Sequence, residues 1–381
     1  MTLPRVAMLG LRAVGEGVSG GVEAHVGELA PRLAAMGCEV TVFCRPRYLA
    51  QGMNQWRGVR LMTLPCMHTR SLEALTHTAL ASLSCLRGFD VIHYHAAGPA
   101  LFSWLPRLAG RTVVATMHGL DHRRAKWGPM ARSALAAGAW CACRFPHRTI
   151  AVSRSLADHL AERYGTRVEH IPNGVIPSAV RPLDALRALG VAGPEYILFL
   201  GRLVPEKGVA QLIAAFRELD TKRQLVVAGG HGHTGRYEAE LRDSAKGDPR
   251  IVFTGPLHGP LKDEAFANAG LFVLPSQLEG LPIALLEAAA AGCPVLVSDI
   301  PPCREVLEEL RDADPRGHVL RTYPQGDHEA LKRAMSGILA EPDLRPKTAG
   351  VAEAARQRFD WDTVARRTLD IYIQALGRRR N

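Results

Sequence analysis

The sequence predicts an α/β protein built from two doubly wound, Rossmann-like domains. Short apolar runs typical of buried parallel strands alternate with segments of helical periodicity along the whole chain. At 381 residues the chain exceeds the size at which one core keeps growing. Three prolines and a glycine interrupt the alternation within residues 171–182. We therefore expect one domain over residues 1–178 and a second over residues 179–360.

Each expected strand is a short run rich in Val, Ile or Leu, and apolar residues recur at helical spacing between the runs. In the first half, strands are expected at Arg5–Leu11, Glu39–Cys44, Val59–Leu64, Asp90–His95, Thr112–Met117 and Arg148–Val152, with helices at Val22–Met36, Ser71–Leu86 and Ser155–Tyr164. In the second half, strands are expected at Tyr196–Leu200, Gln224–Ala228, Arg250–Phe253, Leu271–Leu274 and Val295–Ser298, with helices at Val209–Leu219, Tyr237–Lys246, Lys262–Asn268 and Ile283–Ala291. Residues 361–381 predict a last, amphipathic helix.

Composition excludes several classes of protein. No apolar run approaches the roughly 20 residues that span a bilayer. The first residues, MTLPRVAMLG, lack a signal-peptide pattern, so a cytoplasmic location is expected. The nearest cysteines, Cys141 and Cys143, have neither zinc-site nor redox-motif spacing.

Positive charge is concentrated in the first half of the chain. Residues 1–180 hold 20 Lys and Arg against 10 Asp and Glu, and the remaining residues hold 47 − 20 = 27 against 37 − 10 = 27. The surplus predicts an anionic partner, or it only keeps this half soluble. No nucleic-acid motif or aromatic–basic interleaving is present, so no nucleic acid is expected. An anionic membrane surface is favoured, with the turn at Arg123–Trp127 as its contact, and the protein would then be peripheral at the inner membrane face.

Glu279 and Glu287 flank the junction between a strand ending at Pro275 and a helix starting near Pro282. A carboxylate accepts paired hydrogen bonds from vicinal hydroxyls, and the amides of a helix start attract phosphate. The junction therefore suits an anionic ligand rich in hydroxyl groups. On this segment alone, two surface glutamates remain an alternative.

Other loops that follow strands carry polar groups, and ligands of doubly wound sheets bind beyond the carboxyl ends of strands. Arg202 and Lys207 share one such loop and together suit a diphosphate. Residues 229–235, GGHGHTG, form a glycine loop that is weak evidence alone.

A literal G-x-G-x-x-G occurs at Gly15, Gly17 and Gly20. A nicotinamide site also needs an acidic residue at the end of the second strand, where this chain has Cys44 and Arg45, so a dehydrogenase is disfavoured. Gly20 and Gly21 still form a good phosphate-approach loop before a helix.

Four histidines, His93, His95, His118 and His122, fall on neighbouring strand ends and loops. A metal site is one interpretation, but only Asp121 offers a nearby carboxylate, and hydrogen-bonding or sugar-binding roles rank higher. His118 is the favoured active-site histidine, and no metal is expected.

With these motifs together, the chain resembles the retaining GT-B glycosyltransferases of family 4, in particular bacterial members that build surface polysaccharides. The resemblance covers nearly the whole chain in order. It lies in SGGVEAHV from Ser19, HG at His118, VS at Val152, IPNGV from Ile171, GR at Gly201, KG at Lys207, FTG from Phe253 and EGLPIALLE from Glu279. One departure is Ile176, where the family often has Asp.

The resemblance implies a hexosyltransferase that uses a nucleotide diphosphate sugar and no cofactor or metal. Arg202 and Lys207 would hold the donor diphosphate, Glu287 the ribose, and Glu279 the sugar, while His118 would contact the transferred sugar. Further donor contacts are implied for Gly20, Gly21, Gly255, Leu257, Gly280, Leu281 and Ile283. His95, Asp121 and Arg123 are candidates for the acceptor side, where a saccharide or lipid-linked glycan would bind. The last helix would return to the first domain.

Two other classes of function stay open at this stage. A sugar-nucleotide epimerase or hydrolase on the same scaffold would act without an acceptor. A noncatalytic nucleotide-sugar-binding protein would bind without turnover.

Overall fold

The computed structural model describes residues 3–15, 18, 20–67, 69, 72–124, 127–230, 235–341 and 344–377. The chain forms two compact units, one from Met1–Gly174 with Trp361–Asn381 and one from Val175–Asp360. The chain thus passes from the first unit to the second after Gly174, before the boundary expected at residue 178. The reason is local, because the Val175 N–H donates to the Phe359 carbonyl at 2.7 Å and Val175 pairs with Asp360.

The first unit contains an eight-stranded sheet in the order β3-β4-β2-β1-β5-β6-β7-β8, parallel except for β3. The strands are β1 (Arg5–Leu9), β2 (Glu39–Cys44), β3 (Gln55–Trp56), β4 (Val59–Thr63), β5 (Val91–His95), β6 (Thr112–Met117), β7 (Arg148–Ala151) and β8 (Val168–His170). The order reverses between β1 and β5, which makes that pair the topological switch point of the sheet.

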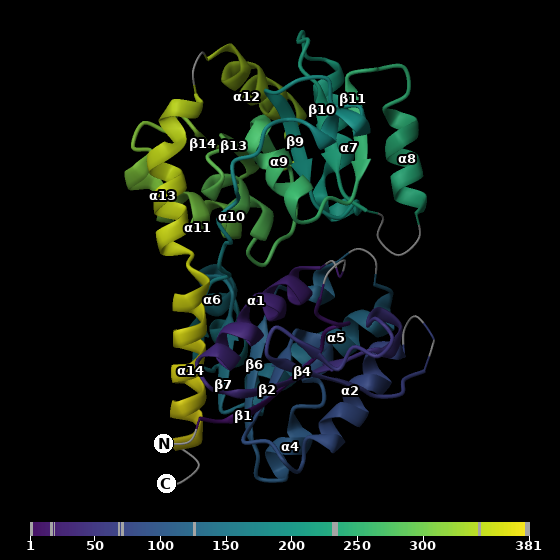
Figure 1. The fold of residues 1–381 in the computed structure, drawn as a ribbon, viewed down its shortest axis with the longest axis vertical. Helices are drawn as coiled ribbons and strands as arrows, with labels where there is room; N and C mark the ends of the chain where they lie inside the picture. Colours follow the sequence, from purple (N-terminus) through teal and green to yellow (C-terminus); the bar gives the residue numbers. More distant parts are fainter. Residues whose placement is uncertain are drawn as a thin grey trace. The chain divides into compact units, whose positions relative to one another are not determined.

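Helices connect these strands as parallel crossovers require (Figure 1). They are α1 (Gly21–Ala35), α2 (Glu73–Ser84), α3 (Ala97–Ala100), α4 (Trp104–Leu108), α5 (Pro129–Arg144) and α6 (Arg154–Tyr164), with 3-10 turns η1 (Pro46–Tyr48) and η2 (Asp121–Arg123).

Helix α14 (Trp361–Gly377) packs against α1 in the core of the first unit, although the whole second unit, Val175–Asp360, lies between the two helices in the sequence. Trp361 and Tyr372 are buried in that core. Gly174 leaves no room for a side chain, since a Cβ there would lie 2.6 Å from the Trp361 ring. The segments at which the chain leaves and re-enters the first unit therefore contact each other at Gly174 and Trp361.

The second unit contains a six-stranded parallel sheet in the order β11-β10-β9-β12-β13-β14. Its strands are β9 (Tyr196–Leu200), β10 (Leu225–Ala228), β11 (Ile251–Gly255), β12 (Ala269–Leu274), β13 (Val295–Ser298) and β14 (Leu320–Tyr323). Its helices are α7 (Val209–Arg217), α8 (Arg236–Ser244), α9 (Pro260–Asn268), α10 (Ile283–Ala290), α11 (Pro301–Glu309), α12 (His328–Ala340) and α13 (Ala349–Arg358), with 3-10 turns η3 (Ala185–Leu189), η4 (Pro205–Lys207), η5 (Arg311–Ala313) and η6 (Arg345–Thr348). Both sheets are doubly wound, as predicted.

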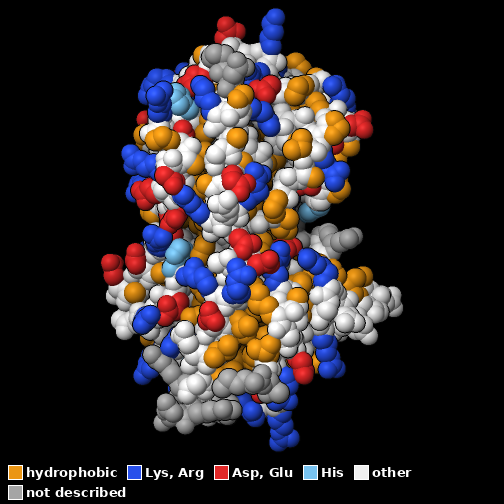
Figure 2. Space-filling view, turned by 60° about the vertical axis from the view of Figure 1, so that its left-hand side comes forward, with side chains coloured by type: hydrophobic (Ala, Val, Ile, Leu, Met, Phe, Trp, Pro, Cys, Tyr) orange, Lys and Arg blue, Asp and Glu red, His pale blue; other side chains and the backbone are white. Residues whose placement is uncertain are grey.

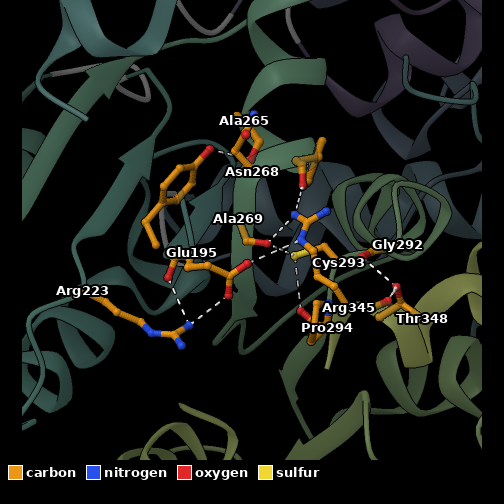
Figure 3. Close-up of polar contacts among 12 residues, drawn as sticks. Glu195, Arg223, Ala265, Asn268, Ala269, Gly292, Cys293, Pro294, Arg345 and Thr348 are labelled. Carbon is orange, nitrogen blue, oxygen red and sulfur yellow. Dashed lines mark hydrogen bonds and ion pairs between the residues drawn. The ribbon is translucent and has the colours of Figure 1, made fainter. Parts of the chain in front are cut away.

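A polar cluster ties together the amino edge of this second sheet (Figure 3). The Arg345 guanidinium donates to the Phe266 and Ala269 carbonyls at 3.1 and 2.6 Å, and Glu195 pairs with Arg223 at 3.2 Å. Gly270 is required beside them, because a Cβ there would lie 2.7 Å from the Glu195 carboxylate. Both arginines line a cavity of about 300 Å³, and both are already paired with protein groups.

On α13 and on α14, Arg side chains are interspersed among Asp and Glu (Figure 2). Ion pairs on these helices include Arg358–Asp312 at 2.5 Å and Arg32–Asp362 at 2.8 Å. Neither helix therefore presents a continuous basic surface. Among the described helices, none has the length and apolarity needed to cross a bilayer.

Candidate functional site

The switch point of the second sheet lies between β9 and β12, and the candidate site is built on the loops that follow these two strands. Lys207 ends η4 after β9, and Glu279 lies on the loop after β12. The Lys207 Nζ donates to Glu279 Oε1 at 2.5 Å, with 15% and 10% of the two side chains exposed. An ion pair therefore bridges the switch point.

Glycines allow the loops at this edge to approach one another. Gly208 has a φ of +70°, and a Cβ there would lie 2.1 Å from the Pro275 carbonyl oxygen. Gly229 is equally restricted, since its Cβ would lie 1.8 Å from the Gly201 oxygen. The Gln277 N–H donates to the Glu206 carbonyl at 2.8 Å. Close backbone contact thus holds the loop that carries Lys207 against the loop that carries Glu279.

Glu287 is 9% exposed in α10 and accepts a hydrogen bond from Lys262 Nζ at 2.6 Å. Lys262 lies in the first turn of α9 and was not among the predicted site residues. Its Nζ is the cation that balances a nearly buried carboxylate. A second ion pair thus joins α9 and α10, the helices that follow β11 and β12.

The remaining residues predicted for the donor side of the second unit occupy the same edge. Gly255 ends β11 with a φ of +75°, and its carbonyl accepts from the Gly229 N–H at 2.9 Å. The residues at or after the ends of β9, β11 and β12 are Arg202, Gly255, Leu257, Gly280, Leu281 and Ile283.

The glycine loop of the first unit follows β1 at the other switch point. Gly20 has a φ of +147°, and a Cβ there would lie 2.0 Å from Glu23 Oε2. Glu23 is 9% exposed and pairs with Arg12 at 2.9 Å, so a carboxylate already occupies the start of α1 beside Gly20 and Gly21. Gly17 and Ser19 of this motif, and His231–Thr234 of the second glycine loop, lie outside the described residues.

A histidine cluster lies in the first unit. His95 ends β5, His118 follows β6, and His95 Nδ1 lies 3.2 Å from His118 Nε2. His25 of α1 packs edge-on to His118, with ring centroids 4.7 Å apart. Burial lowers the pKa of His25 to about 4 and holds the pKa values of His95 and His118 well below the ordinary range. These imidazoles are therefore neutral at pH 7.

The sequence did not identify His25, whose Nδ1 lies 2.9 Å from the Asn173 amide oxygen. His93 is buried behind the cluster, with its two nitrogens bonded to the Tyr372 and Thr116 hydroxyls at 2.7 Å each. His93 is thus a core residue that ties β5 to α14.

The acceptor-side candidates other than His95 lie in η2. Asp121 pairs with Arg124 at 2.9 Å, and Arg123 is exposed. Asp121 already has a partner within its own turn, and Arg123 is open to a ligand.

Comparison with known proteins decides the family. Residues 19–179 match the family model described as Glycosyltransferase Family 4, and residues 187–358 match the model described as Glycosyl transferases group 1. The chain belongs to the family 4 glycosyltransferases. Both the resemblance and the GT-B fold class predicted from the sequence are confirmed.

Relatives of this glycosyltransferase include a phosphatidyl-myo-inositol mannosyltransferase of Mycobacterium leprae, 28% identical and covering 93% of each chain. Among solved structures, sucrose-phosphate synthase of Thermosynechococcus elongatus has a TM-score of 0.80 at 22% identity, covering 98% of this chain and 99% of that one. HepE of Anabaena, in complex with UDP and glucose, has a TM-score of 0.77 at 19% identity, covering 97% and 100%. The two structures support the shared fold.

This glycosyltransferase uses a nucleotide sugar, in agreement with the general activity predicted from the sequence. Within its second unit, the structure brings Lys207 together with Glu279 and Lys262 together with Glu287. Within its first unit, it brings His95 together with His118.

Proposed function

We propose that the chain is a retaining glycosyltransferase that moves a hexose from a nucleotide diphosphate sugar to a saccharide or lipid-linked acceptor in cell-surface polysaccharide synthesis. The observation that carries this proposal is the Lys207–Glu279 pair across the switch point of the second sheet. One member suits a phosphate and the other suits hydroxyl groups.

The donor would exchange partners with this pair. Its diphosphate would bind Lys207 and Arg202, and its sugar hydroxyls would donate hydrogen bonds to Glu279. The two cations would offset the negative charge that grows on the leaving diphosphate, in the role that a metal has in other transferases. Glu287, held by Lys262, would accept from the ribose hydroxyls. HepE, with UDP and glucose bound, supports a nucleoside diphosphate and a hexose as the ligand class.

Retention would follow if a leaving phosphate oxygen took the acceptor proton on the face from which it departs. Neither glutamate would then act as a nucleophile, because both are engaged in holding hydroxyls and lysines. His118, neutral and partly exposed, would hydrogen-bond the transferred sugar.

A lipid-linked acceptor is supported by the mannosyltransferase relative, whose name includes a phosphatidylinositol. Such an acceptor requires a surface that meets the membrane. Trp127 is half-buried, which disfavours the turn at Arg123–Trp127 as its anchor. A better surface lies on α2 and α4, which pack together and expose apolar side chains close in the sequence to the exposed Arg87 and Arg107. The exposed apolar residues are Leu80, Leu83, Trp104 and Leu108.

The first test is a thermal-shift screen of nucleoside diphosphates, since a ligand of the folded state raises Tm. The stabilising nucleotide then names the donor for an assay with a panel of acceptors, with products identified by mass spectrometry and the anomeric configuration by NMR. Lys207→Ala and Glu287→Ala should abolish turnover. Lys246→Ala and Glu240→Gln are matched controls, because their charges lie in exposed pairs on or next to α8.

The outcomes separate the alternatives. Sugar release without acceptor in preference to transfer would indicate a hydrolase, and an altered nucleotide sugar would indicate an epimerase. Nucleotide binding without turnover over the panel would indicate a noncatalytic protein. Full activity of both Lys207→Ala and Glu287→Ala would refute the assigned site.

A further inference from the structure

Three imidazoles converge in the first unit from elements that are far apart in sequence. His25, His95 and His118 each offer one ring nitrogen, and these three atoms all lie within 4.8 Å of one another. The His95 and His118 nitrogens are already 3.2 Å apart. In a tetrahedral site with bonds of about 2.0–2.1 Å, neighbouring nitrogens lie roughly 3.3 Å apart. One pair therefore has the required spacing, and the third ring needs a shift of at most about 1.5 Å.

The hydrogen bond from His25 to Asn173 determines which nitrogen of His25 is available. The Asn173 oxygen accepts at 2.9 Å, so Nδ1 carries the hydrogen and Nε2 keeps its lone pair. Histidine ligands of metals commonly donate their second N–H to an oxygen in this way, which orients the ring. Asn173 is 3% exposed and holds His25 from a different part of the chain.

The other rings are also prepared for coordination. His95 is fully buried, and its Nδ1, which lies 3.2 Å from His118 Nε2, is the nitrogen that would coordinate the ion. Its ring stacks on His93 with centroids 4.1 Å apart, and His93 cannot compete as a ligand because both of its nitrogens are bonded. His118 is partly exposed, which gives an ion access to the cluster from solvent.

We infer that His25, His95 and His118 form a binding site for a divalent transition metal ion of the Zn²⁺ type. A set of three imidazoles without a carboxylate or thiolate suits Zn²⁺, Co²⁺, Ni²⁺ or Cu²⁺ and disfavours Mg²⁺ and Ca²⁺. The ion is not a cofactor of transfer. This part of the inference rests on the proposed function. The bound ion inhibits sugar transfer, because coordination uses the imidazole that His118 would otherwise offer to the sugar.

Binding is tested with untagged, metal-free protein and Co²⁺, whose tetrahedral complexes absorb visible light far more strongly than the hydrated ion. The expected result is visible bands that saturate at about one equivalent and disappear when Zn²⁺ is added. Zn²⁺ should raise the Tm of the protein by a few degrees, and Mg²⁺ at the same concentration should not.

Two substitutions locate the ion. His118→Asn removes the partly exposed ligand, and His25→Gln keeps a group able to bond Asn173. Each should remove the Co²⁺ bands, while His122→Gln, a neighbouring histidine outside the cluster, should keep them. If His25→Gln fails to fold, His118→Asn still decides. A spectrum like that of hydrated Co²⁺, or bands that survive both substitutions, would overturn the site.

Inhibition is tested separately, so that its failure is distinguishable from failure of the proposed function. Zn²⁺ should lower the transfer rate of the wild type at least tenfold at saturation, and a chelator should restore it. A higher donor concentration should raise the Zn²⁺ concentration that is needed for half-maximal inhibition. If no transfer activity exists, the Co²⁺ spectrum still tests the site. Bands with undiminished transfer would retain the metal site and refute inhibition.

Discussion

Lys207 Nζ lies 2.5 Å from Glu279 Oε1, and this contact joins the loops that follow β9 and β12. Each charge neutralises the other, and both side chains are largely buried, at 15% and 10% exposure. A ligand that brings both a diphosphate and vicinal hydroxyls can replace both partners at once. A ligand with only one of these groups leaves the other residue unpaired, at a cost in affinity. The pair therefore favours an intact nucleotide sugar.

Glu279→Gln tests this exchange directly. The substitution keeps the side-chain volume but removes the charge that holds Lys207, so a nucleoside diphosphate should bind as tightly as in the wild type or more tightly. Transfer should fall by about 10²-fold or more, because a sugar hydroxyl loses its charged acceptor. Calorimetric Kd values and kcat/KM give the two readouts, with Glu240→Gln as the control. Weaker diphosphate binding would contradict the exchange.

Lys262→Ala leaves the Glu287 carboxylate without its 2.6 Å partner. The donor KM should rise roughly tenfold with little change in kcat, because the loss concerns binding that the ground state and the transition state share. Lys262→Arg should recover most of the affinity, and Lys246→Ala should have no effect. An unchanged donor KM in Lys262→Ala would remove Lys262 from the site.

Sequence patterns predicted most strands of both sheets and the loops that bear Lys207 and Glu279, because strand period and loop position are local properties. The partners of the site residues were not predictable in the same way. Lys262 faces Glu287 only because α9 and α10 come together in the fold. His25 looked like an ordinary position of an amphipathic helix, and Asn173, which holds it, is 148 residues away.

Helix α5 (Pro129–Arg144) shows a different limit. Its run of Ala and Gly has little contrast between apolar and polar faces, so periodicity gave no prediction there. The short strands β3, β8 and β14 were missed because two to four residues carry too little pattern.

Stability of the first unit should fall in mild acid because of His25. The ordinary histidine pKa of 6.5 applies to the unfolded chain, and burial lowers the folded value to about 4. Above pH 6.5 both states are neutral. Between about pH 6.5 and 4 the unfolded state binds the extra proton, so the free energy of unfolding decreases as pH falls, by at most roughly 3 kcal/mol. His93, whose pKa burial lowers to about 3, acts in the same direction.

The measurement is Tm against pH for wild type, His25→Gln and an exposed control, His258→Gln. The substituted protein should start from a lower Tm at pH 7 and lose less of it on acidification. An equal slope in wild type and His25→Gln would show that other groups govern acid sensitivity.

Arg345→Met should lower stability and leave donor binding unchanged. The guanidinium satisfies the Phe266 and Ala269 carbonyls at the junction of α9 and β12, and methionine keeps only the apolar stem. The expected loss is about 1–3 kcal/mol in the unfolding of the second unit, measured with urea. This cluster (Figure 3) lies at the amino edge of the sheet, whereas the donor loops follow the carboxyl ends of the strands. A raised nucleotide Kd would show that the two edges are coupled. Arg236→Met, at a side chain 86% exposed, is the control.

Membrane association should depend on α2 and α4 and not on Trp127. Leu83 and Leu108 are 51% and 76% exposed on these helices, and each lies near an exposed arginine, Arg87 or Arg107. Apolar contact and attraction to anionic head groups would act together there, and added salt would weaken the second contribution. Flotation with vesicles containing phosphatidylglycerol at low salt should recover the wild type, and Leu83→Glu with Leu108→Glu should remain at the bottom of the gradient. Val180→Glu, at a position 95% exposed in the other unit, should float like the wild type. Wild-type protein that stays at the bottom at low salt would refute membrane association, and flotation of the double variant would refute the surface on α2 and α4.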